Sequence, residues 1–263
     1  MSSSEKDVEI RAVGEAGKVI LSLFQQDQTI QTKGKAYNLV TEADIKSEEA
    51  IVSTIKESFP DHAFLAEETG KSTGESEYMW VIDPLDGTNN YAHKFPHFSI
   101  SIALCKDEKP VLGVIYDPLR EELFCAEQGK GSYLNDERIR VSSTSDLSDS
   151  ILATGFYYDR GSLMKQTLQQ MEAFFGKPIR GIRRTGSAAL DMSYVACGRL
   201  DGFWELILSP WDYAAAAVIA TEAGGKVTDI KGGDFDLFMN NIVVSNTQIH
   251  DGIIKVTEGS VLD

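Results

Sequence analysis

A run of apolar residues in the first half of the chain ends directly in two aspartates. In the stretch MWVIDPLDGTNNY (79–91), four apolar residues are followed by Asp83 and, three positions later, by Asp86. The apolar part has the composition of a buried strand, and the residues after it are typical of turns. The sequence therefore predicts two carboxylates at the end of a strand, where they can meet a charged ligand.

Further acidic residues stand where other predicted strands end or predicted helices begin: Asp44, Glu67, Glu68 and Asp212. Taken alone, each is typical of a helix cap or a turn. If several of them converge, each close pair repels by about 4 kcal/mol at about 4 Å in an effective dielectric near 20. The segments around Glu67, Asp83 and Asp212 supply no lysine or arginine as a neutraliser. Either some carboxyls are protonated or divalent cations hold them together.

The spacing of the two aspartates favours a hard cation. The Asp-Pro-Leu-Asp sequence turns two carboxylates and a backbone carbonyl toward one side of a rigid loop, an all-oxygen set of the kind that Mg²⁺ prefers. An EF-hand would need acidic ligands at alternate loop positions, which this run lacks. The histidines contain no helix-spaced pair, which makes zinc or iron less expected: they are His62, His93, His97 and His250.

Gly87 and Thr88 complete the loop after the aspartates. A glycine permits close backbone approach, and successive amides at this point can receive a phosphate oxygen. The threonine hydroxyl can position a water molecule. Cations, a phosphate cradle and a held water together indicate phosphoryl transfer to water.

These residues resemble the Mg²⁺-dependent, Li⁺-sensitive phosphatases typified by inositol monophosphatase. WVIDPLDGTNNY resembles the first signature of that family, WDYAAAAVIATEAGG resembles the second, and LAEET supplies the paired glutamates expected upstream. The order and spacing of the motifs extend the resemblance from about Val8 to Val244. It implies a five-layered αβαβα sandwich of the α/β (α+β) class, a homodimer, and two to three Mg²⁺ ions, for which Mn²⁺ would substitute.

The resemblance also implies oxygen ligands for each metal. The first metal would be held by Glu67, Asp83, the carbonyl of Leu85 and Thr88. The second would be held by Asp83, Asp86 and Asp212. The third would be held by Glu67 and water, with help from Glu68.

Catalytic and substrate-binding roles follow from the same resemblance. Asp44 would hydrogen-bond Thr88 and so activate the nucleophilic water, with Glu67 as the third catalytic residue. The amides of Gly87 and Thr88 would grip the phosphate. The residues expected to contact the substrate are Asp86, Gly87, Thr88, Ala188, Glu205 and Asp212.

The sequence leaves the substrate open. The segment between Glu68 and Trp80 is short, and Ser209-Pro210 departs from the animal enzymes; both lie near the mouth of the expected site. The leading expectation is a small polyol phosphate such as inositol monophosphate. Alternatives are phosphatases for fructose 1,6-bisphosphate, NADP(H) or 3'-phosphoadenosine-5'-phosphate. A different class is a regulatory or RNA-associated binding partner.

The elements that would position these residues fall into two tightly packed portions, 1–141 and 142–263. In the first, helices are predicted over 8–24 and 44–58, the second with Ile45, Val52, Ile55 and Phe59 on its buried side. Mostly antiparallel strands are predicted over 63–66, 79–82, 98–104, 111–116, 122–126 and 132–134. In the second portion, strands over 151–154, 179–184 and 202–205 alternate with helices over 163–175, 188–197 and 211–223.

Composition limits the partners. The net charge of -15 over 263 residues would repel nucleic acid or an anionic membrane, so neither is expected as a partner. The basic cluster of Arg180, Arg183 and Arg184 is expected to be a solvated face, and residues 25–35 to be polar and mobile. With no apolar run of membrane-spanning length and no secretory signal, a cytoplasmic location is expected. Three widely spaced cysteines are expected to be reduced packing residues.

Overall fold

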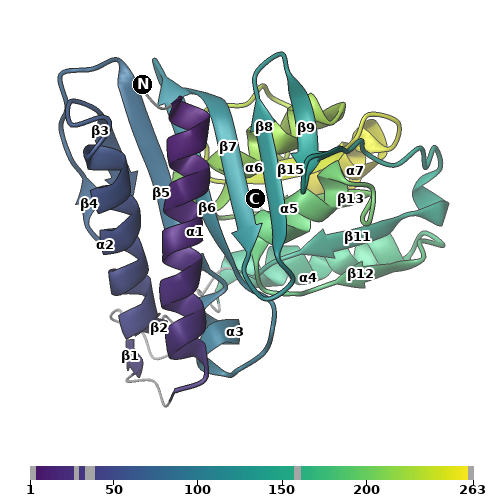
Figure 1. Ribbon diagram of the computed structural model, residues 1–263. Coiled ribbons are helices and arrows are strands. Elements are labelled where there is room, and N and C mark those ends of the chain that lie inside the picture. Colours follow the sequence, from purple (N-terminus) through teal and green to yellow (C-terminus); the bar gives the residue numbers. More distant parts are fainter. Residues whose placement is uncertain (1–3, 27–29, 33–38, 157–160, 260–263) are drawn as a thin grey trace.

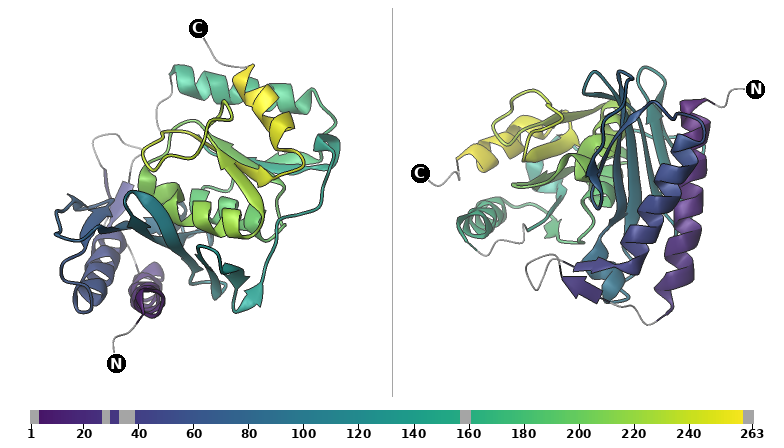
Figure 2. Two further views of the ribbon diagram at one scale, coloured as in Figure 1. Left: turned by 90° about the horizontal axis from the view of Figure 1, so that it is seen from above. Right: turned by 90° about the vertical axis from the view of Figure 1, so that its left-hand side faces the viewer.

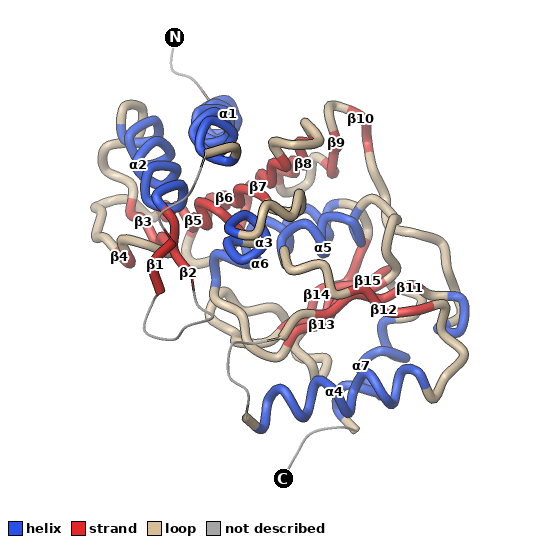
Figure 3. The backbone as a smooth tube through the Cα atoms, turned by 90° about the horizontal axis from the view of Figure 1, so that it is seen from below, coloured by secondary structure: helices blue, strands red, loops and turns tan. Residues whose placement is uncertain are grey.

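The computed structural model describes residues 4–26, 30–32, 39–156 and 161–259. In this part of the chain, helical layers alternate with two sheets to give five layers in the order αβαβα (Figure 1). Figure 3 shows the layers edge-on, with the N-terminus on one outer side and the C-terminus on the other. The three helical layers are the outer pair α1 (Glu5–Phe24) and α2 (Glu42–Lys56), the central pair α5 (Ala188–Ala196) and α6 (Pro210–Glu222), and the far pair α4 (Ser162–Phe175) and α7 (His250–Glu258).

The larger sheet lies between the outer and the central helices (Figure 2). Its strands follow the order β10-β9-β8-β7-β6-β5-β3-β4, and all neighbours are antiparallel except β3 and β5. The strands are β3 (Ala63–Ala66), β4 (Gly70–Lys71), β5 (Tyr78–Asp86), β6 (Ser99–Lys106), β7 (Lys109–Asp117), β8 (Glu122–Glu127), β9 (Gly131–Leu134) and β10 (Glu137–Arg138).

The smaller sheet lies between the central and the far helices and has the order β12-β11-β13-β15-β14. Strand β11 is parallel to both its neighbours, whereas β15 is antiparallel to both of its own. The strands are β11 (Ile151–Thr154), β12 (Gly181–Arg183), β13 (Gly202–Glu205), β14 (Gly225–Thr228) and β15 (Ile242–Asn246). The remaining elements are the paired strands β1 (Ile30–Thr32) and β2 (Leu39–Thr41), helix α3 (Thr88–Ala92) and a 3₁₀ turn at Leu147–Asp149.

The two-sided burial of β5 explains the apolar run in the sequence. Successive side chains of a strand point to opposite faces. Trp80 and Ile82 pack with the side chains of α1 and α2, while Met79 and Val81 pack with those of α5 and α6. Because helices cover both faces, the strand has no polar alternation until its carboxylates begin.

Most predicted elements are present within a few residues of their expected bounds, with four differences. Strand 79–82 continues to Asp86, and residues 30–32 of the expected mobile segment form β1; residues 27–29 and 33–35 of that segment lie outside the described residues. Ile45 is 48% exposed, so its expected burial is wrong; the buried face of α2 turns through Asp44, Ser47 and Ile51 instead. The structure also contains one helix and five strands that were not predicted: α7, β2, β4, β10, β14 and β15. The division at residue 142 stays a prediction.

The cysteines are free, as expected: Cys105 and Cys125 are buried, and Cys197 is half-buried. None of the helices in the described part of the chain is both long enough and apolar enough to cross a membrane. The location of the protein stays a prediction.

Close packing between the larger sheet and the central helices should make one glycine irreplaceable. A Cβ at Gly113 of β7 would lie 2.6 Å from the carbonyl oxygen of Ala215 in α6. Gly113→Ala is therefore expected to lower the free energy of unfolding by about 1–3 kcal/mol through overpacking. Gly14→Ala in α1, where no neighbouring atom lies within 4 Å of the new Cβ, should raise it by about 0.5–1 kcal/mol. Urea unfolding of both variants checks the opposite signs, and a neutral Gly113→Ala would contradict the packing.

Candidate active site

The carboxylates of Asp83, Asp86 and Asp212 meet at the C-terminal end of β5. One oxygen from each lies within 4.8 Å of the other two. Residues three apart in a regular strand would point to opposite faces, but the pairing of β5 with β6 is irregular between Asp83 and Asp86. This break in the alternation allows both aspartates to reach the same group, to which α6 adds Asp212.

The electrostatics of this group favour a bound cation. Burial, followed by repulsion from Glu67 and the neighbouring aspartates, raises the pKa of Asp83 well above its ordinary value. The pKa of Asp212 is raised by burial, then by Glu67 and Asp86. Burial also raises the pKa of Asp86 to about 6, although hydrogen bonds oppose the shift. Several carboxylate oxygens that repel one another at this separation form a donor set that fits Mg²⁺.

Asp86 is held by the beginning of helix α5. Its Oδ2 accepts a hydrogen bond from the amide of Ala189 at 2.9 Å and another from the Ser187 hydroxyl, and its Oδ1 accepts one from the amide of Ala188 at 3.3 Å. The partial positive charge of a helix N-terminus favours an anion at this position. The Ala188 amide is therefore engaged by Asp86, although Ala188 still lines the cavity described below.

Asp44 and Asp212 each occupy the third position of a helix. The Asp212 Oδ2 atom accepts a hydrogen bond from the amide of Ser209 at 2.6 Å, and the Asp44 Oδ2 atom accepts one from the amide of Thr41 at 2.7 Å. Both are capping arrangements that fix the carboxyl group relative to its helix. In each case the cap engages the Oδ2 atom of the carboxylate.

The hydrogen bond predicted between Asp44 and Thr88 is present. The Thr88 hydroxyl lies 3.0 Å from Asp44 Oδ1 and 3.1 Å from the carbonyl oxygen of Leu85. Gly87 precedes it with φ of 97°, and a Cβ there would lie 3.1 Å from the carbonyl oxygen of His97. Only glycine adopts this conformation easily, so the loop depends on it.

A cavity of about 450 Å³ opens over this group. Of the predicted site residues, it is lined by Glu67, Asp86, Gly87, Ala188, Glu205 and Asp212. Asp83 and Leu85 are buried beneath it, and Asp44 stands behind Thr88. Two further predicted site residues, Glu68 and Thr88, do not line the cavity, although each follows a residue that does. The roles of these residues stay predictions.

Besides the predicted Glu205, the cavity is lined by two charged groups that the sequence did not reveal as site residues, Asp191 and Arg184. Burial raises the pKa of Glu205 well above its ordinary value; Asp212 adds to the shift and Arg184 opposes it. Burial raises the pKa of Asp191 to about 7, against hydrogen bonds from the Thr185 hydroxyl to both carboxylate oxygens at 2.7 Å. The cavity lining thus contains two carboxyl groups with raised pKa values and one guanidinium.

The basic cluster predicted as a solvated face is divided in the structure. Arg180 pairs with Asp149 at 2.8 Å on the surface. Arg184 is exposed but lines the cavity, and its guanidinium lies over Gly186, where an added Cβ would be 2.7 Å from Nη1. Only the position of Arg184 in the fold distinguishes it from its neighbours, because nothing in the spacing of the cluster does.

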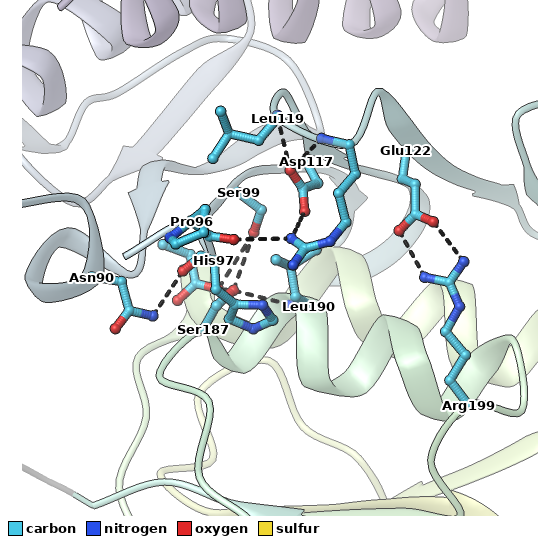
Figure 4. A network of polar contacts seen from close by, with 12 residues as sticks. Asn90, Pro96, His97, Ser99, Asp117, Leu119, Glu122, Ser187, Leu190 and Arg199 are labelled. Atoms are coloured by element: carbon cyan, nitrogen blue, oxygen red, sulfur yellow. Dashed lines mark hydrogen bonds and ion pairs between the residues drawn. The ribbon is translucent and has the colours of Figure 1, made fainter. Parts of the chain in front are cut away.

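Hydrogen bonds behind the cavity join the segments that form it (Figure 4). The hydroxyls of Ser99 and Ser187 lie 3.4 Å apart, and the amide of Leu190 donates to Ser187. Asn90 donates to the carbonyl of His97 at 2.7 Å and to that of Thr185 at 3.0 Å. Helix α3, which follows β5, is thereby joined to the segment that precedes α5.

Glu48 is a further residue that the sequence reasoning missed. It is 2% exposed and accepts hydrogen bonds from the amides of Glu68 and Thr69. Its position four residues after Asp44, on the same face of a helix, was the available signal. The sequence could not show which distant backbone this carboxylate contacts.

This five-layered fold and its group of buried carboxylates define a class of protein, the metal-dependent phosphatases. The chain belongs to the inositol monophosphatase family, whose sequence profile matches residues 2–262. The resemblance predicted from the motifs is therefore confirmed.

Similar proteins span nearly the whole chain. The inositol-1-monophosphatase of Synechocystis is 44% identical over 93% of this chain and 85% of its own. The Nus factor SuhB of Haemophilus influenzae is 42% identical over 92% and 91%. Among solved structures, the extragenic suppressor protein suhB of Bartonella henselae has a TM-score of 0.93 at 38% identity, covering 98% and 100%. The inositol monophosphatase of Anabaena has a TM-score of 0.86 at 40% identity, covering 96% and 94%.

The repulsion within the acidic group predicts a stability that depends on cations and pH. Because the folded-state pKa values are raised, the folded protein binds these protons more tightly than the unfolded chain. Without a divalent cation, the contribution of these groups to stability should be greatest below about pH 4. It should decline as the pH rises from about 4 through about 6, the folded-state pKa of Asp86. Mg²⁺ at neutral pH should restore it and raise Tm by mass action.

Thermal unfolding with chelator and with Mg²⁺ checks this expectation. Asp83→Asn should raise Tm in chelator, because one repelling charge is removed, and should shrink the Mg²⁺-dependent increase. Asp136→Asn, at an exposed turn, is the matched control and should leave both quantities unchanged. An equal Mg²⁺ response in all three proteins would contradict a cation site at this group.

Proposed function

We propose that the protein is a Mg²⁺-dependent phosphatase that hydrolyses phosphomonoesters of small polyols such as inositol monophosphate. The observation that carries the proposal is the meeting of Asp83, Asp86 and Asp212 beneath a cavity whose opposite wall carries Glu205 and Asp191. The family of the chain supports a phosphatase, and the name of the Synechocystis relative supports this substrate.

Oxygen atoms of this group would hold the cations. Two to three Mg²⁺ ions would be held by the carboxylates of Glu67, Asp83, Asp86 and Asp212, the carbonyl of Leu85 and the hydroxyl of Thr88, with Glu68 nearby. Bound Mg²⁺ supplies neutralisation of the phosphate charge and acidifies water. The amides of Gly87 and Thr88 would bind the phosphate oxygens. Gly87 has no side chain to obstruct a phosphate, and it adopts the left-handed conformation of this turn without strain.

Asp44 and Thr88 would orient the attacking water. The carboxylate of Asp44 is fully buried and accepts the Thr88 proton at Oδ1 while its Oδ2 remains bound to Thr41. With its proton directed at Asp44, the Thr88 hydroxyl would accept a hydrogen bond from the attacking water. As that water gives its proton to Thr88, the proton of Thr88 would pass to the carboxylate of Asp44.

The carboxyl groups of Glu205 and Asp191 suit substrate hydroxyls. A protonated carboxyl donates a hydrogen bond and an ionised one accepts it. Because the pKa of Asp191 is about 7, both of its forms are accessible near neutral pH, and the raised pKa of Glu205 favours its protonated, donating form. This favours a polyol as the alcohol part of the substrate.

The pairing of Thr88 with Asp44 can be tested by substitution. Thr88→Ser keeps the hydroxyl and should retain substantial activity, whereas Thr88→Val should lower kcat by about 10²- to 10⁴-fold. The kcat of Asp44→Asn should fall by a similar factor. The kcat of the double variant, with Thr88→Val and Asp44→Asn, should be barely lower, because the effects of residues that act as a unit are non-additive. Steady-state kinetics with inositol monophosphate measures all four. A near-normal kcat for Asp44→Asn would reduce Asp44 to a helix cap worth about 1 kcal/mol.

A second candidate substrate class carries another anionic group. Arg184 is the one basic side chain among the described residues that line the cavity. A guanidinium at the mouth of an otherwise acidic cavity can bind a second phosphate bidentately. This observation favours fructose 1,6-bisphosphate, NADP(H) or 3'-phosphoadenosine-5'-phosphate over a singly phosphorylated polyol.

A kinetic panel across these esters separates the two substrate classes. If inositol monophosphate is the substrate, Arg184→Gln should change its kcat/KM by less than about fivefold. If a doubly anionic ester is preferred, the same variant should raise its KM by about tenfold or more, a loss of roughly 1.4 kcal/mol in binding. Arg180→Gln, which alters a surface ion pair, is the matched control.

A role as a regulatory binding partner is the candidate from a different class. It is motivated by relatives named Nus factor SuhB, such as that of Haemophilus influenzae. Such a role would survive in the Asp83→Asn variant, whereas the phosphatase activity would not. Formation of a homodimer, inhibition by Li⁺ and a cytoplasmic location likewise stay predictions.

A further inference from the structure

Three buried residues on one face of helix α2 contact three different segments of the site. Asp44 accepts the hydrogen bond from Thr88 after the end of β5. Ser47 donates its hydroxyl proton to the carbonyl oxygen of Pro84 at 2.9 Å, between the two aspartates of that strand. Glu48 contacts the turn that follows β3. The spacing i, i+3 and i+4 places all three on the same side of the helix.

Glu48 accepts two hydrogen bonds from the turn that carries Glu67. Its Oε2 accepts a hydrogen bond from the amide of Glu68 at 2.9 Å, and its Oε1 accepts one from the amide of Thr69 at 2.9 Å. The preceding amide, that of Glu67, donates to the carbonyl oxygen of Ile82 in β5 at 3.2 Å. Three consecutive amides are thus fixed, one by β5 and two by α2.

The chemistry of this contact requires a carboxylate. Burying a charged carboxylate is costly unless hydrogen bonds replace its water, and Glu48 is 2% exposed. Two short hydrogen bonds from backbone amides to an ionised group provide that replacement. A glutamine in the same place would present an acceptor to one amide and a donor to the other, so it could satisfy only one.

The turn held by Glu48 leads directly to the candidate cation group. Glu67 lines the cavity together with Asp86 and Asp212, and its negative charge raises the pKa of Asp83. Glu48 itself does not line the cavity. Any influence on a cation therefore passes through the position of Glu67.

We propose that Glu48 is a positioning residue that sets the Mg²⁺ affinity of the site by fixing the backbone on which Glu67 stands. The inference rests on the proposed function. Groups that orient a ligand residue typically change metal affinity by about 10- to 100-fold when they are replaced. Glu48 should therefore control the concentration of Mg²⁺ at half-maximal activity more than the rate at saturating Mg²⁺.

Glu48→Gln and Glu48→Ala test the proposal against Glu49→Gln, which alters the next residue on the exposed side of the same helix. Two quantities are measured for each protein: the Mg²⁺ concentration at half-maximal activity and the Mg²⁺ concentration at the midpoint of the increase in Tm. Both should rise by about tenfold or more in Glu48→Ala and by less in Glu48→Gln. At saturating Mg²⁺, kcat should recover to within about threefold of the wild-type value.

Equal Mg²⁺ midpoints in Glu48→Gln and in the wild-type protein would overturn the proposal, as would a loss of kcat that Mg²⁺ does not restore. If Glu48→Ala does not fold, Glu48→Gln decides, because it preserves the shape of the side chain. A wild-type protein that shows a Mg²⁺-dependent Tm but hydrolyses none of the phosphate esters would refute the proposed function alone. In that case the Tm midpoints still test the role of Glu48.

Discussion

The mutual repulsion of three closely spaced carboxylates is the constraint on which the site depends. Asp83, Asp86 and Asp212 come within 4.8 Å of one another, and Asp83 and Asp212 also face the charge of Glu67. A fold can keep such a group together if hydrogen bonds hold its members and either protonation or a bound cation offsets their charge. The chain provides the first of these through helix N-termini: Asp44 and Asp212 cap their own helices, and Asp86 accepts amide hydrogen bonds at the start of α5.

The five layers bring these helix ends together from distant parts of the chain. Helix α2 approaches β5 from one face of the larger sheet, and α5 and α6 approach it from the other (Figure 3). The central helices also cover the smaller sheet, whose strand β13 ends at Glu205. The cations and the substrate alcohol would consequently meet between the two sheets. The larger sheet would supply the cation ligands of β5, and the smaller sheet would supply Glu205 for the substrate hydroxyls.

Motifs made of neighbouring residues could be predicted from the sequence, and contacts between distant residues could not. The apolar run before Asp83 and the capped start of α6 are local patterns, and both were predicted. The end of β5 was missed because its irregular pairing depends on β6. The place of β15 between β13 and β14 depends on pairing with both strands, which the residues of β15 alone do not reveal. Arg184 was missed because no local pattern distinguishes it from a solvated charge. Glu48 offered only its spacing from Asp44, which does not show the distant backbone that it contacts.

The most direct test of the account is the location of a bound metal in crystals of the protein soaked in Mn²⁺. Mn²⁺ favours the same carboxylate ligands as Mg²⁺ and is visible by anomalous scattering. We predict an anomalous peak within about 2.5 Å of carboxylate oxygens of Asp83, Asp86 and Asp212. An ordered, well-resolved site without such a peak at millimolar Mn²⁺, or with the metal bound only elsewhere, would contradict it.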